Sequence, residues 1–280
     1  MLFCRCPRRF LRELLLNACA AGGLAGSAAF AADISLSAPG ADETLRDTLV
    51  AASSVVEADA RGQEGVQELL AAALADYRTM VQVLYDAGYF APVVNIRLDG
   101  REAASIQPLN PPSSIAEIEI AVQPGPKFTF GKAALAPLPA NSTVELPETY
   151  AAGRTATTGA IRDAAQAGRS AWRQAGHAKV QVADLDITAD HLRARLDSEI
   201  LLAPGRKLRF GRLFVTGETA VREEAIRAIA GFPAGEQFHP DSLARVGSRL
   251  RRTGTFSSVT IREAEAANPD GTLDVTADFE

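Results

Sequence analysis

A short motif that occurs twice constrains how this chain can fold. Pro124-Gly125-Pro126-Lys127-Phe128-Thr129-Phe130-Gly131 returns 80 residues later as Pro204-Gly205-Arg206-Lys207-Leu208-Arg209-Phe210-Gly211. This spacing is too long for one turn of a solenoid and suits a small folded unit. We therefore predict a series of similar modules rather than one large domain.

Each copy of the motif is predicted to join two strands. Proline fixes φ and glycine accepts positive φ, so Pro-Gly favours a turn. Apolar residues take even positions before Gly211 (Leu208, Phe210) and odd positions after it (Leu213, Val215). Such a change of parity predicts a bulge or bend, which could let one strand serve two successive modules. The predicted hinges between modules are Gly125, Gly131, Gly205 and Gly211.

Residues 1–31 have the features of a secretory signal peptide. Four arginines precede an apolar stretch from Leu14 to Phe30, and Ala29-Phe30-Ala31 fits the small-x-small rule for cleavage. A single membrane anchor and a lipoprotein box at Cys19 are the alternatives. All three cysteines fall in this segment, so the exported part is expected to form no disulfide and no thiolate metal site.

Composition and charge limit the class of partner. The 280 residues are 47% apolar and 22% charged, which is typical of a globular chain with two or three domains. The net charge is −5, and removing residues 1–31 makes it more negative, because they hold four arginines and one glutamate. An acidic, exported chain lacks the basic surface that nucleic acid requires, so we expect no such partner.

The predicted elements repeat in the order strand, helix, helix, strand, strand. Alternating apolar residues indicate the strands, and i, i+3, i+4 spacing indicates the helices. We assign three modules to residues 32–124, 125–204 and 205–280. The fold class is α+β, with tandem modules that each have a three-stranded mixed sheet covered on one face by two helices.

The ranges follow from the same patterns. Helices are predicted at 43–57, 66–87, 158–175, 221–230 and 240–253. Strands are predicted at 34–36, 94–98, 117–122, 127–135, 180–187, 192–202, 213–217, 259–261 and 273–279. Residues 99–113 are predicted to form an exposed hairpin loop, 189–190 a turn, and 136–157 to contain only a short or irregular first helix.

Three helices end at glycine and pass at once into a hairpin, at Asp86-Ala87-Gly88-Tyr89-Phe90, Gln174-Ala175-Gly176-His177-Ala178 and Arg252-Thr253-Gly254-Thr255-Phe256. With Phe210-Gly211-Arg212-Leu213-Phe214-Val215-Thr216-Gly217, this pattern resembles the POTRA domain, the polypeptide-transport-associated repeat. The long first helix and the Pro-Gly-x-x-Phe-x-Phe-Gly junction resemble the arm of TamA-like outer-membrane assembly factors. The resemblance covers residues 33–280 and is strongest from residue 204 onward.

The resemblance implies a periplasmic arm that precedes an outer-membrane barrel and helps to insert barrel proteins and autotransporters. Its implied partners are unfolded barrel or autotransporter substrates, an inner-membrane-anchored TamB-like protein, and the outer membrane through a C-terminal barrel. A barrel needs many alternating strands of ~10 residues, so we expect this chain to be the arm without its barrel. The alternatives are the POTRA arm of a two-partner secretion transporter and a stand-alone periplasmic scaffold of the cell-division type.

No catalytic, cofactor or metal site is predicted. His177, His191 and His239 lie far apart in predicted strand starts and turns. Residues 125–132 have five residues between their glycines and no Ser or Thr after Lys132, so they do not form a phosphate loop. We predict that the chain is not an enzyme; a stand-alone periplasmic enzyme, the other class considered, needs clustered polar residues in a cleft.

The candidate site is a strip of backbone. If the second strand of each hairpin lies between the other two strands, the first strand of the hairpin is an edge with unpaired N–H and C=O groups. Such an edge accepts an extended peptide by strand addition, unless charge or a neighbouring module protects it. By resemblance the edges are residues 93–98, residues 178–183 and, in the third module, Ser257, Ser258, Val259, Thr260, Ile261 and Arg262.

Overall fold

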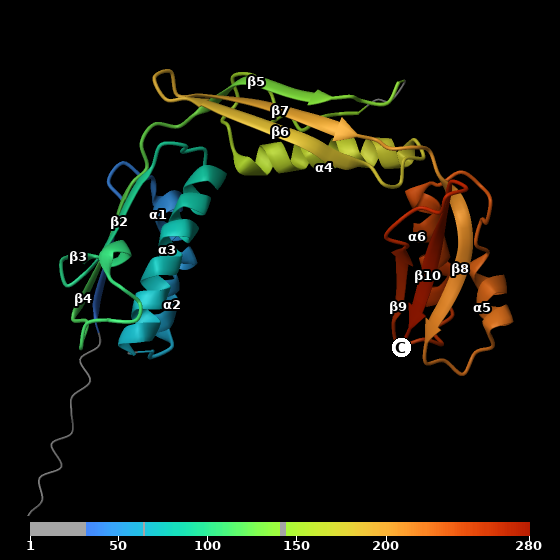
Figure 1. Cartoon of the computed structure of the whole chain (residues 1–280), viewed down its shortest axis with the longest axis horizontal. Coiled ribbons are helices and arrows are strands. Elements are labelled where there is room, and N and C mark those ends of the chain that lie inside the picture. Colours follow the sequence, from blue (N-terminus) through green and yellow to red (C-terminus); the bar gives the residue numbers. More distant parts are fainter. Residues whose placement is uncertain (1–31, 64, 141–143) are drawn as a thin grey trace, which may run out of the picture.

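The computed structural model describes residues 32–63, 65–140 and 144–280. These residues form an arch of three compact units, each with its own sheet (Figure 1). We call the predicted ranges 32–124, 125–204 and 205–280 the first, second and third modules. The predicted signal peptide lies outside the described residues. Within the described part of the chain, no helix is both long and apolar enough to cross a bilayer.

The first module has three α-helices where two were predicted. Its elements are β1 (Asp33–Ser37), α1 (Glu43–Ala52), α2 (Ser54–Ala60), α3 (Val66–Asp86), β2 (Val93–Leu98), β3 (Arg101–Glu102), the 3-10 helix η1 (Ala103–Ser105) and β4 (Glu117–Gln123). The predicted helix 43–57 breaks at Ser53, which has an extended backbone and caps α2 by accepting a hydrogen bond from Val56 N. The predicted loop 99–113 is not wholly exposed, because Ala103 and Ile106 are buried.

Among its described residues, the second module has a single helix. Its elements are β5 (Thr129–Ala136), α4 (Thr158–Gln174), β6 (Gln181–Asp190) and β7 (Arg195–Ala203). The described residues between β5 and α4 form no helix. Instead Tyr150 is buried beside the sheet and donates its hydroxyl hydrogen bond to Ala134 O at 3.0 Å. The predicted turn at 189–190 belongs to β6, and the chain turns at 191–194 instead.

The third module follows the predicted order. Its elements are β8 (Arg209–Gly217), α5 (Glu223–Ala230), α6 (Pro240–Arg252), β9 (Val259–Glu263) and β10 (Thr272–Phe279). α5 ends at Gly231 in the left-handed conformation, and α6 has a proline in its first turn, where no backbone donor is lost.

In every sheet the last strand of the module lies inside. β4 pairs parallel to β1 and antiparallel to β2; β7 does so with β5 and β6, and β10 with β8 and β9. The first sheet adds the short β3 beside β2. These mixed sheets with their helices confirm the predicted α+β class.

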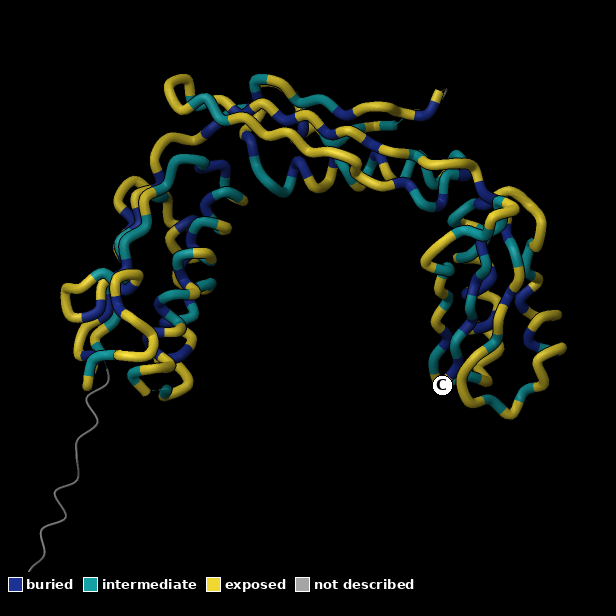
Figure 2. The backbone as a smooth tube through the Cα atoms, viewed as in Figure 1, coloured by how far each residue is buried: buried dark blue, intermediate teal, exposed yellow. Residues whose placement is uncertain are grey.

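Each module buries its own apolar core (Figure 2). The largest buried side chains include Met80 and Ile96 in the first core, Phe128 in the second, and Phe210 and Phe238 in the third. Burying one such side chain stabilises a fold by about 1.5–3 kcal/mol. Three separate cores are consistent with three units that are each stabilised from within.

The predicted bulge is present in both copies of the repeated motif. The register between β5 and β7 shifts between Phe130 and Ala133, and the register between β8 and β10 shifts in the corresponding place. The bulge does not let one strand serve two modules, because β5 and β8 each belong to one sheet.

A carboxylate fills each bulge. Asp197 accepts a hydrogen bond from Lys132 N at 2.7 Å, and Asp274 accepts one from Arg212 N at 2.7 Å. A β-carbon on Gly131 or Gly211 would overlap the carboxylate oxygen. Glycine therefore leaves the space that the aspartate needs to satisfy the bulged backbone.

Candidate edge-strand interface

The predicted third-module site lies at the edge of its sheet. Val259 to Arg262 belong to β9, which pairs with β10 on one side only. Ser257 and Ser258 precede the strand, and both donate backbone hydrogen bonds to Glu280 O, at 2.8 and 3.1 Å. The edge itself is therefore β9, from Val259 to Glu263.

The hydrogen bonds at the ends of β9 show which backbone groups face outward. Ser258 and Glu280 exchange backbone bonds, and Ala264 N donates to Asp274 O at 2.9 Å. In an antiparallel pair the bonded residues alternate, so the backbone groups of Thr260 and Arg262 also face β10. The backbone groups of Val259, Ile261 and Glu263 therefore point away from the sheet.

Part of this edge is already occupied. Arg251 Nη1 donates to Val259 O at 3.3 Å. Helix α6 lies along the strand, and the groove between them has a volume of about 380 Å³. Its lining comes from α6, β9 and the last turn of α4: Arg173, Pro240, Leu243, Ala244, Gly247, Arg251, Ile261 and Glu263.

An ion-pair cluster joins the end of β9 to the second module. Glu263 accepts from Arg173 Nη1 at 3.3 Å and pairs with Lys179 Nζ at 3.5 Å. The Glu263 side chain is only 17% exposed. Arg173 also donates to Ala178 O at 2.7 Å and lies 5.1 Å from the ring centre of Phe238. This cluster fixes one end of the β9 edge and limits its freedom to receive a peptide.

The first-module edge is also partly closed. β3 pairs with Arg97 and Leu98, at the end of the predicted segment 93–98. Glu102 accepts a hydrogen bond from Ile96 N at 3.3 Å, and Tyr77 Oη donates to Ile96 O at 3.2 Å. The free backbone is therefore shorter than the sequence predicted.

The second-module edge is displaced from its predicted position. Ala178 and Val180 are buried, and the edge strand is β6, which begins at Gln181 and continues to Asp190. Residues 181–188 are all exposed. The predicted alternation of apolar residues in this strand did not include Leu185. Leu185 and Ile187 are two residues apart, which is the spacing of side chains on one face of a strand and could have indicated its place. A register shift between Val182 and Asp184 breaks the period and hides that signal.

The glycine-ended helices form the junctions between modules. Gly88 O accepts from Phe128 N at 2.9 Å, and Gly176 O accepts from Leu208 N at 3.0 Å. Both glycines have positive φ, and a β-carbon on either would collide with the next module. In these junctions the residue just before the first strand of a module is hydrogen-bonded to the glycine that follows the last helix of the module before it.

The four predicted hinge glycines lie in two kinds of place. Gly125 and Gly205 have φ of 75° and 67° and lie between the sheets of successive modules. Gly131 and Gly211 lie within β5 and β8, at the carboxylate-filled bulges. A hinge role stays a prediction that applies best to Gly125 and Gly205.

The pKa of the carboxylate at the third-module bulge is lowered by its hydrogen bonds. The hydrogen bond from Arg212 N, assisted by Asn268, holds the pKa of Asp274 below its usual range. A group with a lowered folded pKa stabilises the fold above its unfolded pKa, about 3.9, and this contribution is lost as pH falls through the folded pKa.

We therefore expect the urea midpoint of the third module to fall on acidification below about pH 4. NMR signals of β8 and β10 would report this midpoint. Asp274→Asn keeps an acceptor but does not titrate, so its midpoint should vary less with pH. Asp270 in the same hairpin also has a lowered pKa, owing to Thr272, and keeps its contribution in that variant. Identical pH profiles would contradict the role of Asp274.

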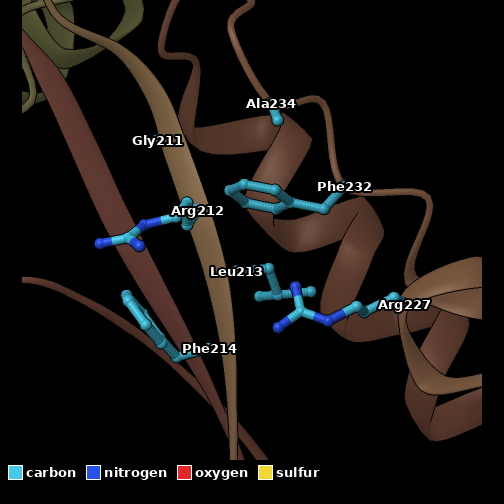
Figure 3. A pocket seen from close by; sticks show the side chains of 7 residues that line it. All are labelled: Gly211, Arg212, Leu213, Phe214, Arg227, Phe232 and Ala234. Atoms are coloured by element: carbon cyan, nitrogen blue, oxygen red, sulfur yellow. The ribbon is translucent and has the colours of Figure 1, made fainter. Parts of the chain in front are cut away.

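A pocket lies between β8 and α5, at the edge of the third sheet opposite the β9 edge (Figure 3). Its volume is about 390 Å³, and it is lined by Gly211, Arg212, Leu213, Phe214, Arg227, Phe232 and Ala234. Arg212 lies 5.1 Å from the Phe214 ring centre, and Arg227 Nε donates to Glu223 at 3.0 Å. This lining offers two guanidinium groups and no side chain that could act as nucleophile or general base.

The three histidines have separate local contacts. His177 Nδ1 donates to Gly205 O at 3.0 Å, the His191 ring packs against Phe128, and His239 caps α6. Within the described residues, no three His, Cys, Asp or Glu side chains are grouped in a way that could hold a metal ion.

Residues 208–280 match the POTRA family, described as surface antigen variable number repeat. The Haemophilus influenzae BamA POTRA3-5 crystal structure has 17% identity and a TM-score of 0.53, covering 74% of this chain and 79% of that chain. BamA from Haemophilus ducreyi lacking POTRA domains 1-3 has 14% identity and a TM-score of 0.44, covering 55% and 29%. POTRA1-3 of Omp85 from Anabaena has 13% identity and a TM-score of 0.33, covering 89% and 93%. A search of curated proteins finds no match.

Proposed function

We propose that this chain is an exported periplasmic arm of a TamA-like factor that assembles outer-membrane proteins and autotransporters. It captures unfolded barrel substrates as extended segments and docks an inner-membrane-anchored TamB-like partner. The POTRA match at residues 208–280 and the fold shared with the BamA POTRA fragment support this assignment. The role is to bind and pass on polypeptide, without catalysis or a cofactor.

One observation carries the proposal: the first strand of each hairpin lies at or near a sheet edge with backbone groups that face outward. In β9 these groups belong to Val259, Ile261 and Glu263, beside the groove under α6. Main-chain hydrogen bonds to an edge give affinity with little demand on sequence. This suits a protein that handles many different unfolded chains.

Replacing Val259 by proline tests the β9 edge. The Val259 N–H faces outward at the first position of the strand, where proline is tolerated and no bond to β10 is lost. Loss of one main-chain hydrogen bond costs about 1 kcal/mol, so photo-crosslinking of an extended barrel-strand peptide to the third module should fall about five- to tenfold.

Val259→Thr is the matched control, because it keeps the N–H and the β-branched shape. Its crosslinking should stay within about twofold of the unchanged chain. The β9 and β10 amide NMR signals report whether each variant keeps its sheet. A folded Val259→Pro chain that crosslinks as well as its control would overturn strand addition at β9.

A further inference from the structure

The β6 edge of the second module differs from the other two edges in being open along its length. Thr129 N donates to Ala194 O, so the groups of Ala194 and Leu196 face β5. By alternation, the groups of Arg195, Asp197 and Glu199 face β6. Their register partners in β6 are Asp190, Thr188 and Asp186. The backbone groups of Leu185, Ile187 and Ala189 therefore face solvent.

These outward groups have almost no competitor. Among the described residues, their single side-chain partner is the neighbouring Asp184 carboxylate, which accepts from Leu185 N at 2.9 Å. β2 and β9 differ, because Glu102 and Arg251 bind their edges. β6 is also the longest of the three, with ten residues against six in β2 and five in β9.

The side chains of β6 form two distinct rows. Val182, Leu185 and Ile187 are 39%, 46% and 43% exposed, and they lie on the face toward α4, opposite buried residues of β7. Among the described residues of this module one helix, α4, contacts β5, β6 and β7, and it leaves this row of β6 partly exposed. A β-carbon at Gly168 of α4 would meet Leu135 of β5 and Leu202 of β7.

The second row is acidic. Asp184 and Asp186 are exposed on the opposite face, and neither has an ion-pair partner within the described residues. Thr188 continues the row. Each apolar residue on one face thus alternates with a carboxylate or hydroxyl on the other.

A second copy of β6 fits this edge poorly. An antiparallel pair centred on Asp186 places Asp186 opposite its own copy, and one centred on Leu185 places Asp184 opposite Asp186. One centred on Ile187 places Asp184 opposite Asp190. Like charges directly opposite are destabilising, so the rows favour a partner of a different sequence.

Resting on the proposed function, we infer that β6 is the principal acceptor edge of the arm, and that it selects extended segments in which apolar and basic residues alternate. The apolar residues of the bound strand extend the row of Leu185 and Ile187 beside α4. Its lysines or arginines lie opposite Asp184 and Asp186. Opposite-charge pairs across strands each favour binding, and like-charge pairs oppose it.

The test compares two photo-crosslinkable peptides on the chain from residue 32 to 280, one alternating valine with lysine and one alternating valine with glutamate. The valine–lysine peptide should bind about tenfold more tightly, with crosslinks on β6. Asp184→Asn with Asp186→Asn should reduce this preference to about twofold or less, while the Asn side chain can still accept from Leu185 N. Asp47→Asn with Asp59→Asn, the same charge change on the first module, should leave it intact.

Ile187→Pro removes an outward N–H and no bond to β7, so it should weaken the binding of both peptides about five- to tenfold, whereas Ile187→Thr should not weaken it.

Equal binding of the two peptides, with Ile187→Pro still weakening both, would overturn the charge selectivity but not strand addition at β6. An ineffective Ile187→Pro would overturn the β6 site, while Val259→Pro tests the proposed function separately. A concentration-dependent dimer that blocks the peptide would identify a second copy as the occupant and overturn the inference.

Discussion

Replacing Gly211 by alanine is expected to destabilise the third module by about 2–4 kcal/mol. The new methyl group needs the space of the Asp274 carboxylate, and a displaced Asp274 leaves Arg212 N without its hydrogen bond. Overpacking costs about 1–3 kcal/mol, and the lost bond adds about 1 kcal/mol. Hydrogen exchange of β8 and β10 amides, compared with that of the first module, measures the effect.

Gly254→Ala is the matched control. Gly254 has φ of 66°, and a β-carbon added there would meet nothing within 4 Å, so the cost is conformational only, about 1 kcal/mol. If Gly211 acted mainly as a hinge, its substitution would change the angle between modules and leave exchange within the third module unaltered. That outcome would contradict the bulge explanation.

Replacing Asp76 by alanine should destabilise the first module by about 3–5 kcal/mol. Asp76 is fully buried and accepts three hydrogen bonds: from Ser53 Oγ at 2.6 Å, Ser54 N at 2.6 Å and Val55 N at 3.3 Å. Alanine leaves these donors at the start of α2 without their acceptor, and each such buried loss costs about 1–3 kcal/mol. Exchange of the α2 and α3 amides would increase first.

Ser53→Ala separates this carboxylate from the cap that Ser53 itself provides. It removes one donor to Asp76 and the acceptor of Val56 N, but both backbone bonds to Asp76 remain, so about 1–2 kcal/mol is expected. A cost for Asp76→Ala no larger than that for Ser53→Ala would show that the backbone donors find other partners.

The sequence predicted the parts of the fold that depend on local pattern. The bounds of α3, including its end before Gly88, were predicted within a residue, since helical period and a left-handed glycine are local signals. The bulge at Gly211 was predicted from the change of parity. The missing helix of the second module was only partly foreseen, because its place is taken by irregular chain around the buried Tyr150.

The state of each edge could not be predicted, because it depends on residues far along the chain. Glu263 is held by Arg173, 90 positions away, and Asp274 binds the amide of Arg212, 62 positions away. The predicted second edge, residues 178–183, is displaced from β6 because an inserted residue at the β6 bulge disrupts strict alternation. The prediction therefore located hairpins but not which backbone groups remain free.

The glycine junctions have a consequence for how such chains change length in evolution. In both, a glycine carbonyl accepts a hydrogen bond from the amide of the residue just before the first strand of the next module, so the bond does not depend on that residue's side chain. An in-frame deletion of residues 128–207 would join Lys127 to Leu208, so that Leu208 N could donate to Gly88 O. Gln237, which lies against Gly176, would then take the place beside Gly88 that Thr155 has now. Recombination between the two copies of the motif could therefore remove or add a whole module without requiring a new type of contact.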